Sequence, residues 1–166
     1  MADISVDELV GFGLANVLVR KGTGPDALGA ALGFAVVWGP VASQGPGIAL
    51  LGTGPGQWLA YTDQAAPDWA ATLGETLSGV ATVVDQSSAY TLLRIAGADA
   101  HRLLQMGLPV DLSVPAPGAV VVSAIAHIGV IVHQVAPESF HLAVFRSFAA
   151  SLRDWLDASI ASLAVH

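Results

Sequence analysis

The chain of 166 residues contains no cysteine. Disulfide bonds, thiolate nucleophiles and cysteine metal ligands are therefore all excluded. The opening residues, MADISVDELV, are acidic, whereas a signal peptide begins with basic residues. A cysteine-free chain with such a start fits a reducing compartment, and we expect a cytoplasmic protein.

Charged residues are also scarce, at 11% of the chain against roughly 25% in an average soluble domain. The 13 acidic residues outnumber the 6 Arg and Lys residues, and the basic ones never cluster beyond Arg20 and Lys21. We therefore expect no nucleic acid and no anionic membrane as a ligand. Because 54% of the residues are hydrophobic, we expect part of this charge-poor surface to contact other proteins.

No Asp, Glu, Lys, Arg or His occurs anywhere between Ala27 and Thr62. Glycine and proline interrupt this charge-free segment repeatedly. Its longest apolar piece, ALGAALGFAVVWGPVA, is shorter than the ~20 residues needed to cross a bilayer as a helix. We expect no membrane span here.

Three glycines and a proline stand between two apolar runs in LLGTGPGQWLAYT, which covers residues 50–62. A phosphate-binding loop needs Lys and then Ser or Thr after its last glycine, but Gln57 and Trp58 follow Gly56. A dinucleotide fingerprint would need a third glycine where Gln57 stands. The stretch instead predicts two strands joined by a Gly-Pro-Gly turn.

The N-terminal part, residues 1–45, keeps neither helical nor strand periodicity for long. It is too apolar for a disordered tail, so we expect an arm or irregular strands that lie on the rest of the chain or on a partner. Residues 46–166 show clearer patterns, and the total length is typical of one domain with one core.

Hydrophobic periodicity and turn residues predict the elements of residues 46–166. Strands are expected at 48–52, 57–62, 80–85, 89–97 and 140–145, and helices at 67–78, 97–107 and 146–163, the last with Ser147 as its N-cap. Residues 119–135 read as one long strand bent at Gly129 or as two short strands. Residues 108–118 form a proline-rich loop.

This order of elements favours an α+β fold, in which helices cover one face of a mainly antiparallel sheet. A ferredoxin-like split βαβ arrangement is the leading topology.

Three histidines on neighbouring strand segments, His127, His133 and His141, raise the question of a metal site. If the tip of the intervening turn lies at residues 137–138, His141 pairs with Gln134 and points to the face opposite His133. A bulged or odd-numbered loop would instead place the two histidines on a shared face, where Glu138 at the turn is the one acidic residue nearby. We therefore expect ordinary histidines and no metal centre, because structural zinc needs a closed set of four ligands.

Other chemical motifs are missing as well, since no G-x-S-x-G elbow occurs. Asp85, Asp99 and Asp111 each fit a local role, in a strand-end turn, the first turn of a helix and a loop. We predict no catalytic, cofactor-binding or metal-binding residue. Tryptophan and arginine are enriched at the centres of protein interfaces, so we take Trp58, Arg94, Arg146 and Trp155 as candidate interface residues.

Five segments, in this order and spacing, resemble the gamma subunit of bacterial heterotetrameric sarcosine oxidase, over residues 47–160. They are the hairpin GPGQWL (54–59), the segment DQS (85–87), the helix entry IAGADAHRLL (95–104), PVDL (109–112) and RSFAASLRDWL (146–156).

The resemblance implies the α+β fold of the folate-binding aminomethyltransferase group, which includes the T-protein of glycine cleavage. T-protein relatives carry an acidic pair that handles the aminomethyl group, whereas GVIVHQ (129–134), the nearest place here, has no acid. The resemblance further implies a non-catalytic accessory subunit of an oxidoreductase complex that oxidatively demethylates sarcosine or a related N-methyl amine.

Large flavoprotein subunits would then be the partners and would hold FAD, FMN, NAD and tetrahydrofolate, while this chain alone holds none. A stand-alone folate-binding or aminomethyltransferase-like protein, or a homo-oligomeric structural domain, remains the alternative.

Overall fold

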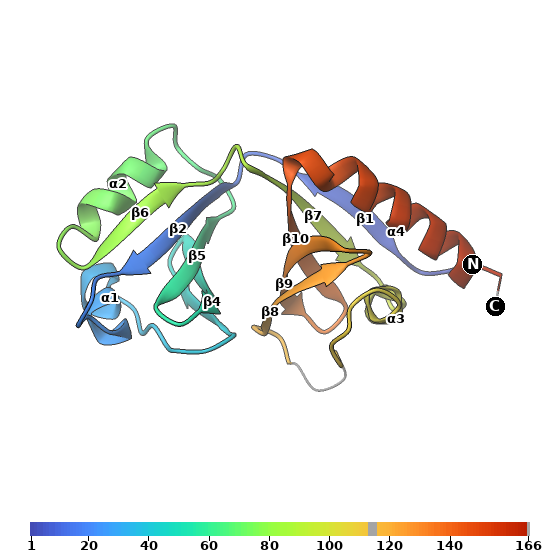
Figure 1. Cartoon of the computed structure of the whole chain (residues 1–166), viewed down its shortest axis with the longest axis horizontal. Coiled ribbons are helices and arrows are strands. Elements are labelled where there is room, and N and C mark those ends of the chain that lie inside the picture. The colour runs from blue at the N-terminus through green and yellow to red at the C-terminus, as the bar shows by residue number, and fades with distance from the viewer. Residues whose placement is uncertain (113–115, 166) are drawn as a thin grey trace. The chain divides into compact units, whose positions relative to one another are not determined.

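The structure is a computed structural model that describes residues 1–112 and 116–165 (Figure 1). The chain divides into two compact units. The terminal unit consists of residues 1–9 and of the chain from residue 89 onward, and the central unit consists of residues 10–88. Each unit contains its own five-stranded antiparallel sheet and its own hydrophobic core.

The sheet of the terminal unit has the strand order β1-β7-β10-β9-β8. Its strands are β1 (Ser5–Leu9), β7 (Tyr90–Ala96), β8 (Val120–Ile125), β9 (Ile128–Ala136) and β10 (Ser139–Phe145). Its helical elements are α3 (Ala100–Gln105), the 3-10 turn η1 (Arg146–Phe148) and α4 (Ala149–Leu163).

One face of this sheet packs against its helices. Phe140 and Leu142 from the sheet meet Leu104 of α3 and Leu156 of α4 in the core, and all four side chains are fully buried. The leucines of α4 recur at helical spacing, so a single apolar stripe of that helix faces the sheet.

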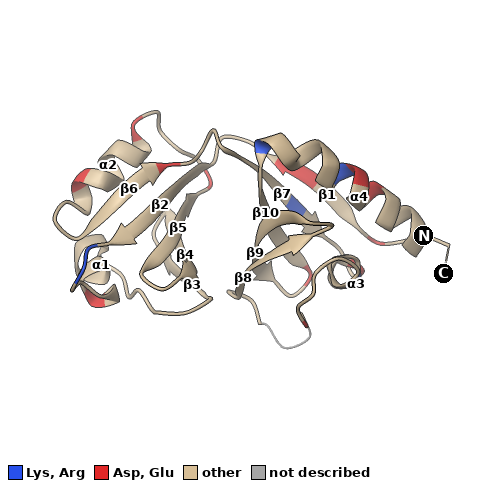
Figure 2. Cartoon of the chain, viewed as in Figure 1, with Lys and Arg blue, Asp and Glu red and all other residues tan. Residues whose placement is uncertain are grey.

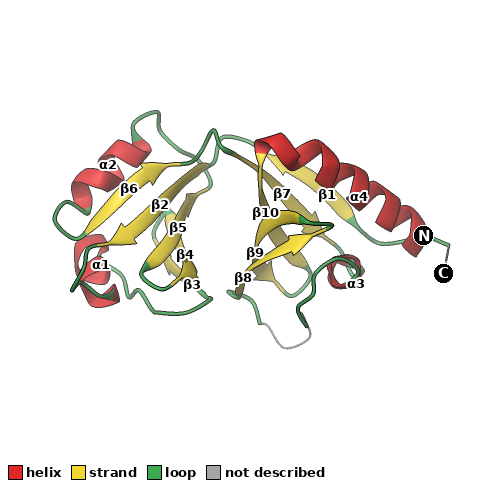
Figure 3. Cartoon of the chain, in the orientation of Figure 1, coloured by secondary structure: helices red, strands yellow, loops and turns green. Residues whose placement is uncertain are grey.

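The sheet of the central unit has the order β3-β4-β5-β2-β6. Its elements are β2 (Gly13–Val19), α1 (Pro25–Leu32), β3 (Ala42–Gly45), β4 (Ile48–Gly54), β5 (Gln57–Thr62), α2 (Trp69–Thr76) and β6 (Ala81–Asp85). Leu28 of α1 and Leu73 of α2 pack with Val17, Leu50 and Trp58 of the sheet in one core. Figure 3 shows the helices in red and the strands in yellow.

The α+β class, the antiparallel pairing and the placing of helices on one face are confirmed. The predicted hairpin at residues 48–62 is confirmed too, because β4 and β5 pair around a turn in which Gly56 has a φ of 67°. The structure contains two sheets and two cores, where the length had suggested one core.

The first 45 residues form three strands and a helix, and they contribute to both sheets. β1 pairs with β7, and β2 lies between β5 and β6 in the sheet of the other unit. The compact units therefore do not divide at residue 45, which ends β3 at the tight turn leading into β4.

The two-strand alternative for residues 119–135 is confirmed, because β8 and β9 form a hairpin that turns at Ala126 and His127, both at positive φ. Two local expectations are wrong. Gly129 lies within β9 and marks no bend. Ser147 lies inside η1, and the residue that precedes α4 is Phe148, with no side-chain cap. Part of the expected loop, residues 113–115, lies outside the described residues.

No helix among the described residues is both long and apolar enough to span a membrane.

Candidate functional site

The glycine-rich stretch has a structural role in the central unit. Gly52 of β4 donates its N–H to the Val41 carbonyl at 3.0 Å, and a Cβ at Gly52 would collide with the Gly39 carbonyl oxygen. The segment between α1 and β3 therefore lies directly on the backbone of β4. These glycines allow a turn and a close approach of two backbones.

A β-bulge in the terminal unit changes the expected placing of the histidines. The register of β9 and β10 shifts between Ser139 and Phe140, so His141 pairs with His133 and not with Gln134. The leading prediction, that the two histidines face opposite sides, is therefore wrong, and the alternative of a bulge that places them on a shared face is confirmed. Their rings meet edge to face, with centroids 6.2 Å apart.

The environment of His133 keeps its imidazole neutral. The residue is 4% exposed, and its Nδ1 atom is buried without a hydrogen-bond partner. Burial lowers the pKa of His133 to about 4, and repulsion from His141 adds to this effect. Within residues 1–112 and 116–165, no three His, Cys, Asp or Glu side chains gather closely enough to hold a metal ion.

Arg94 lies in the same cross-strand row, since it pairs with His141 on one side and with Asp7 on the other. Its guanidinium donates to the Asp7 carboxylate at 2.9 Å, and both side chains are about half exposed. An exposed ion pair of this kind contributes about 0 to 1 kcal/mol, so it orients Arg94 more than it stabilises the sheet.

The two candidate tryptophans lie in different environments. Trp58 is 1% exposed and belongs to the core of the central unit, so its own ring offers no surface to a partner. The exposed tryptophan of this unit is Trp38, which was not among the candidate interface residues and whose ring lies against Trp58, with centroids 5.3 Å apart and planes tilted by 38°. Trp155 of α4 is half-buried and packs its ring directly over Gly107, at the end of α3.

Arg146 lies at the start of η1 between two exposed aromatic residues. Phe145 and Phe148 are 48% and 50% exposed, and Arg146 is exposed as well. The ring of Phe145 stacks on Tyr90 of β7, with centroids 4.7 Å apart and planes 21° from parallel. Burial raises the pKa of Tyr90, so its phenol stays protonated beneath this stack.

The segment DQS (85–87) ties two strand ends together in the central unit. The Asp85 carboxylate accepts the N–H of Ser87 at 2.9 Å, which closes a turn after β6. The Ser87 hydroxyl oxygen then accepts the N–H of Leu14 at 3.0 Å and donates to the Leu14 carbonyl at 3.3 Å. Asp85 therefore has the predicted local role, and Ser87 acts as a structural bridge.

The helix entry and the PVDL segment have similar roles in the terminal unit. The Asp99 carboxylate accepts the N–H of Asp3 at 2.9 Å, although it does not cap α3 through its side chain. Gln105 holds the following loop, donating to the Val110 carbonyl at 2.6 Å and accepting the N–H of Leu112 at 3.0 Å.

The fold is shared with two solved proteins. A chain of the heterotetrameric sarcosine oxidase from Corynebacterium sp. U-96, in complex with pyrrole 2-carboxylate, matches with a TM-score of 0.82 and 24% identity, over 96% of this chain and 84% of that one. The glycine cleavage system aminomethyltransferase T from Bartonella henselae matches with a TM-score of 0.68 and 14% identity, over 93% of this chain but only 45% of that one. No curated protein sequence matches significantly.

These likenesses define the chain as an α+β protein of the fold found in aminomethyltransferase T and in a sarcosine oxidase subunit. A family model described as "Sarcosine oxidase, gamma subunit family" matches residues 26–162, which is most of the sequence. The chain belongs to the sarcosine oxidase gamma subunit family.

Proposed function

We propose that this chain is a non-catalytic accessory subunit of a heterotetrameric sarcosine oxidase, or of a related complex that oxidatively demethylates an N-methyl amine. The family match over residues 26–162 carries the proposal, because it extends over most of both compact units. Two polar side chains of the segments that carry the resemblance have structural roles: Ser87 bridges two strand ends, and Asp99 holds the backbone of Asp3 just before β1.

The partners in this proposal are large flavoprotein subunits that bind FAD, FMN, NAD and tetrahydrofolate. Its support is the uncharged part of the surface of this chain: Val37 and Val41, just before β3, are exposed apolar residues. They belong to the charge-free segment from Ala27 to Thr62, whose largely buried strands β4 and β5 also carry no acidic or basic residue in Figure 2. Half-exposed Trp38 lies in the same segment. An uncharged surface of this kind is desolvated at low cost when it meets an apolar protein surface.

Three of the candidate interface residues have side chains at the surface, and we assign them to contacts with a large subunit. They are Arg94, Arg146 and half-buried Trp155, whereas Trp58 supports the exposed ring of Trp38 from below. The proposal includes a cytoplasmic location, with which a cysteine-free chain is compatible.

Stand-alone aminomethyl transfer is less well supported, although the fold is shared with an aminomethyltransferase. In β9, Val132 faces the core and His133 is buried and neutral, and no carboxylate occurs between Gly129 and Gln134. A cationic amine intermediate would find no negative charge on this part of the strand.

Co-expression with the large subunits of the same organism tests the proposal. The tagged chain is purified under mild salt, and the co-purifying subunits are identified by mass spectrometry and by flavin absorbance. We expect near-stoichiometric flavoprotein subunits and sarcosine-dependent oxygen consumption, and a lower yield of the complex when this chain is omitted. An equally stable and active complex without this chain would refute the accessory role.

Two further measurements on the isolated chain distinguish the alternatives. Saturable binding of tetrahydrofolate would support a stand-alone folate protein. A homo-oligomer in light scattering, together with no flavoprotein in the purification, would support a self-assembling structural domain.

A further inference from the structure

We infer that Phe145, Arg146 and Phe148 form an anchor that docks on a large subunit at a place where a carboxylate lies beside apolar surface. We call these three residues the Phe-Arg-Phe anchor. The inference rests on the proposed function and assigns a surface to it.

The anchor is held rigidly by the terminal unit. Phe145 ends β10 and stacks on Tyr90, which is 9% exposed and therefore fixed in place. The N–H of Arg146 donates to the Ala89 carbonyl at 2.9 Å, which pins the start of η1 to the residue before β7. A surface aromatic that is already ordered loses little conformational entropy on binding, so more of its contact energy appears as affinity.

The two phenylalanine rings of the anchor do not belong to the hydrophobic core of this unit. Both rings are about half exposed, whereas Val144 and Leu152, which flank the anchor in the sequence, are fully buried. Exposing aromatic surface to water is unfavourable, so covering these rings with a partner protein contributes strongly to the binding free energy.

Charge indicates what the partner must supply. Among the described residues, Arg94 pairs with Asp7 and Arg153 approaches Glu8, whereas Arg146, like Arg20, Lys21 and Arg102, has no carboxylate partner. Arg146 differs from the other three in lying between two exposed phenylalanine residues. A guanidinium covered by a partner must find a carboxylate there, because an unpaired buried charge is strongly unfavourable.

A second copy of this chain fits the anchor less well than a different protein. Homodimer contacts are usually two-fold symmetric, and a two-fold contact through the anchor would bring two Arg146 side chains together. Each copy also has a formal net charge of -7, so two copies repel each other at a distance. The partner that fits the anchor is therefore a large subunit.

A competition experiment tests the anchor in the assembled complex. Wild-type and variant chains with different tags are co-expressed with the large subunits, and the ratio of the two chains in the flavoprotein complex is compared with their ratio in the soluble lysate. The anchor variants are Arg146→Glu and the double variant Phe145→Ser with Phe148→Ser. Thermal unfolding of each purified variant verifies that it folds.

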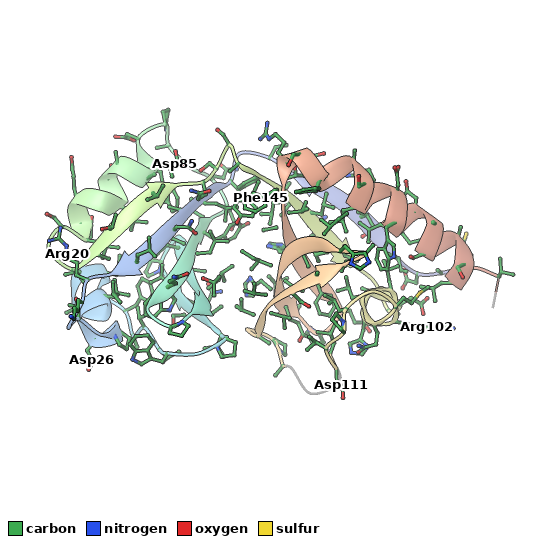
Figure 4. The ribbon with its side chains drawn as sticks, in the orientation of Figure 1. Arg20, Asp26, Asp85, Arg102, Asp111 and Phe145 are labelled. Atoms are coloured by element: carbon green, nitrogen blue, oxygen red, sulfur yellow. The ribbon has the colours of Figure 1, made fainter. Side chains whose placement is uncertain are left out.

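Matched controls make the same kinds of substitution, a charge reversal and a loss of apolar side-chain area, at exposed residues outside the anchor. Arg102→Glu reverses an exposed arginine on α3 that also lacks a carboxylate partner among the described residues and lies far from Phe145 (Figure 4). Val122→Ser removes apolar area from a side chain that is 57% exposed on β8.

We expect both anchor variants to be depleted from the complex by about 10-fold or more, as for residues at the centre of an interface, and both controls to be incorporated within about 2-fold of wild type.

Equal incorporation of anchor and control variants into a normal complex would overturn the anchor while the proposed function stands. If wild type itself enters no flavoprotein complex, the proposed function fails and the anchor with it. If the anchor variants lose only self-association, the occupant is a second copy and the inference is wrong.

Discussion

The rings of His133 and His141 lie edge to face, with centroids 6.2 Å apart, because a register shift between Ser139 and Phe140 sets the two residues opposite each other. His133 is only 4% exposed, and its buried Nδ1 atom has no hydrogen-bond partner. A proton on this ring would be desolvated and would also face a second imidazole, which explains why its pKa is lowered to about 4.

This lowered pKa predicts that the chain loses stability in mild acid. The unfolded chain binds a proton at His133 near pH 6.5, whereas the folded chain binds it only near pH 4. The stabilisation is therefore complete above about pH 6.5 and is lost as the pH falls to about 4, by up to about 3 kcal/mol. Urea unfolding at a series of pH values measures this loss. The variant His133→Leu has no imidazole at this position, so its free energy of unfolding should fall less than that of wild type between pH 6.5 and pH 4.

A matched control for this prediction is His127→Asn, which changes an exposed histidine at the tip of the β8–β9 hairpin. Asn tolerates the positive φ of 67° at this position, so the control should keep the acid sensitivity of wild type. An NMR titration in which the His133 ring takes up its proton near pH 6.5 would contradict the prediction.

Local patterns in the sequence predicted much of this fold. The Gly-Pro-Gly turn and the turn at Pro137 and Glu138 are visible because their residues fix the backbone locally. The α+β class follows from the alternation of strand and helix patterns. Asp85 could be placed in a strand-end turn for the same reason.

Long-range pairing could not be predicted in the same way. A period-two pattern identifies a strand but not its partner, so nothing near β1 indicates that it pairs with β7. The register shift between Ser139 and Phe140 skips Val135 of β9 and moves His141 to the face of His133, and turn residues alone do not reveal whether such a bulge forms. Composition also does not distinguish buried Trp58 from exposed Trp38, whose ring lies tilted against it.

Gly97 is predicted to be essential for docking the N-terminal strand. Its φ is 128°, and a Cβ there would collide with the backbone carbonyl oxygen of Asp3. Gly97→Ala should therefore lower the free energy of unfolding by about 2 kcal/mol or more and speed hydrogen exchange of the β1 amides. The control Gly129→Ala has open space around the new Cβ and should be neutral. Equal effects of the two variants would count against this account of Gly97.

Ser87 is predicted to stabilise the end of β2 through its hydroxyl. Ser87→Ala removes both hydrogen bonds to Leu14, whose N–H is then left without its acceptor. Because Leu14 is 1% exposed, the cost should be about 1 to 2 kcal/mol in urea unfolding. The neighbouring Ser88 is exposed, so Ser88→Ala should change stability by less than about 0.5 kcal/mol. A Ser87→Ala variant as stable as wild type would rule out the bridge as a stabilising contact.

Gln105 is predicted to order the PVDL loop, because its amide group donates to Val110 and accepts from Leu112 at once. Gln105→Ala removes both bonds and should speed hydrogen exchange at the Leu112 amide by about 10-fold, at a cost of about 1 kcal/mol in stability. Gln105→Glu keeps the acceptor for Leu112 but places a carboxylate against the Val110 carbonyl. It should therefore protect the Leu112 amide better than alanine does. If alanine and glutamate give the same exchange rate as wild type, the loop is held by other contacts.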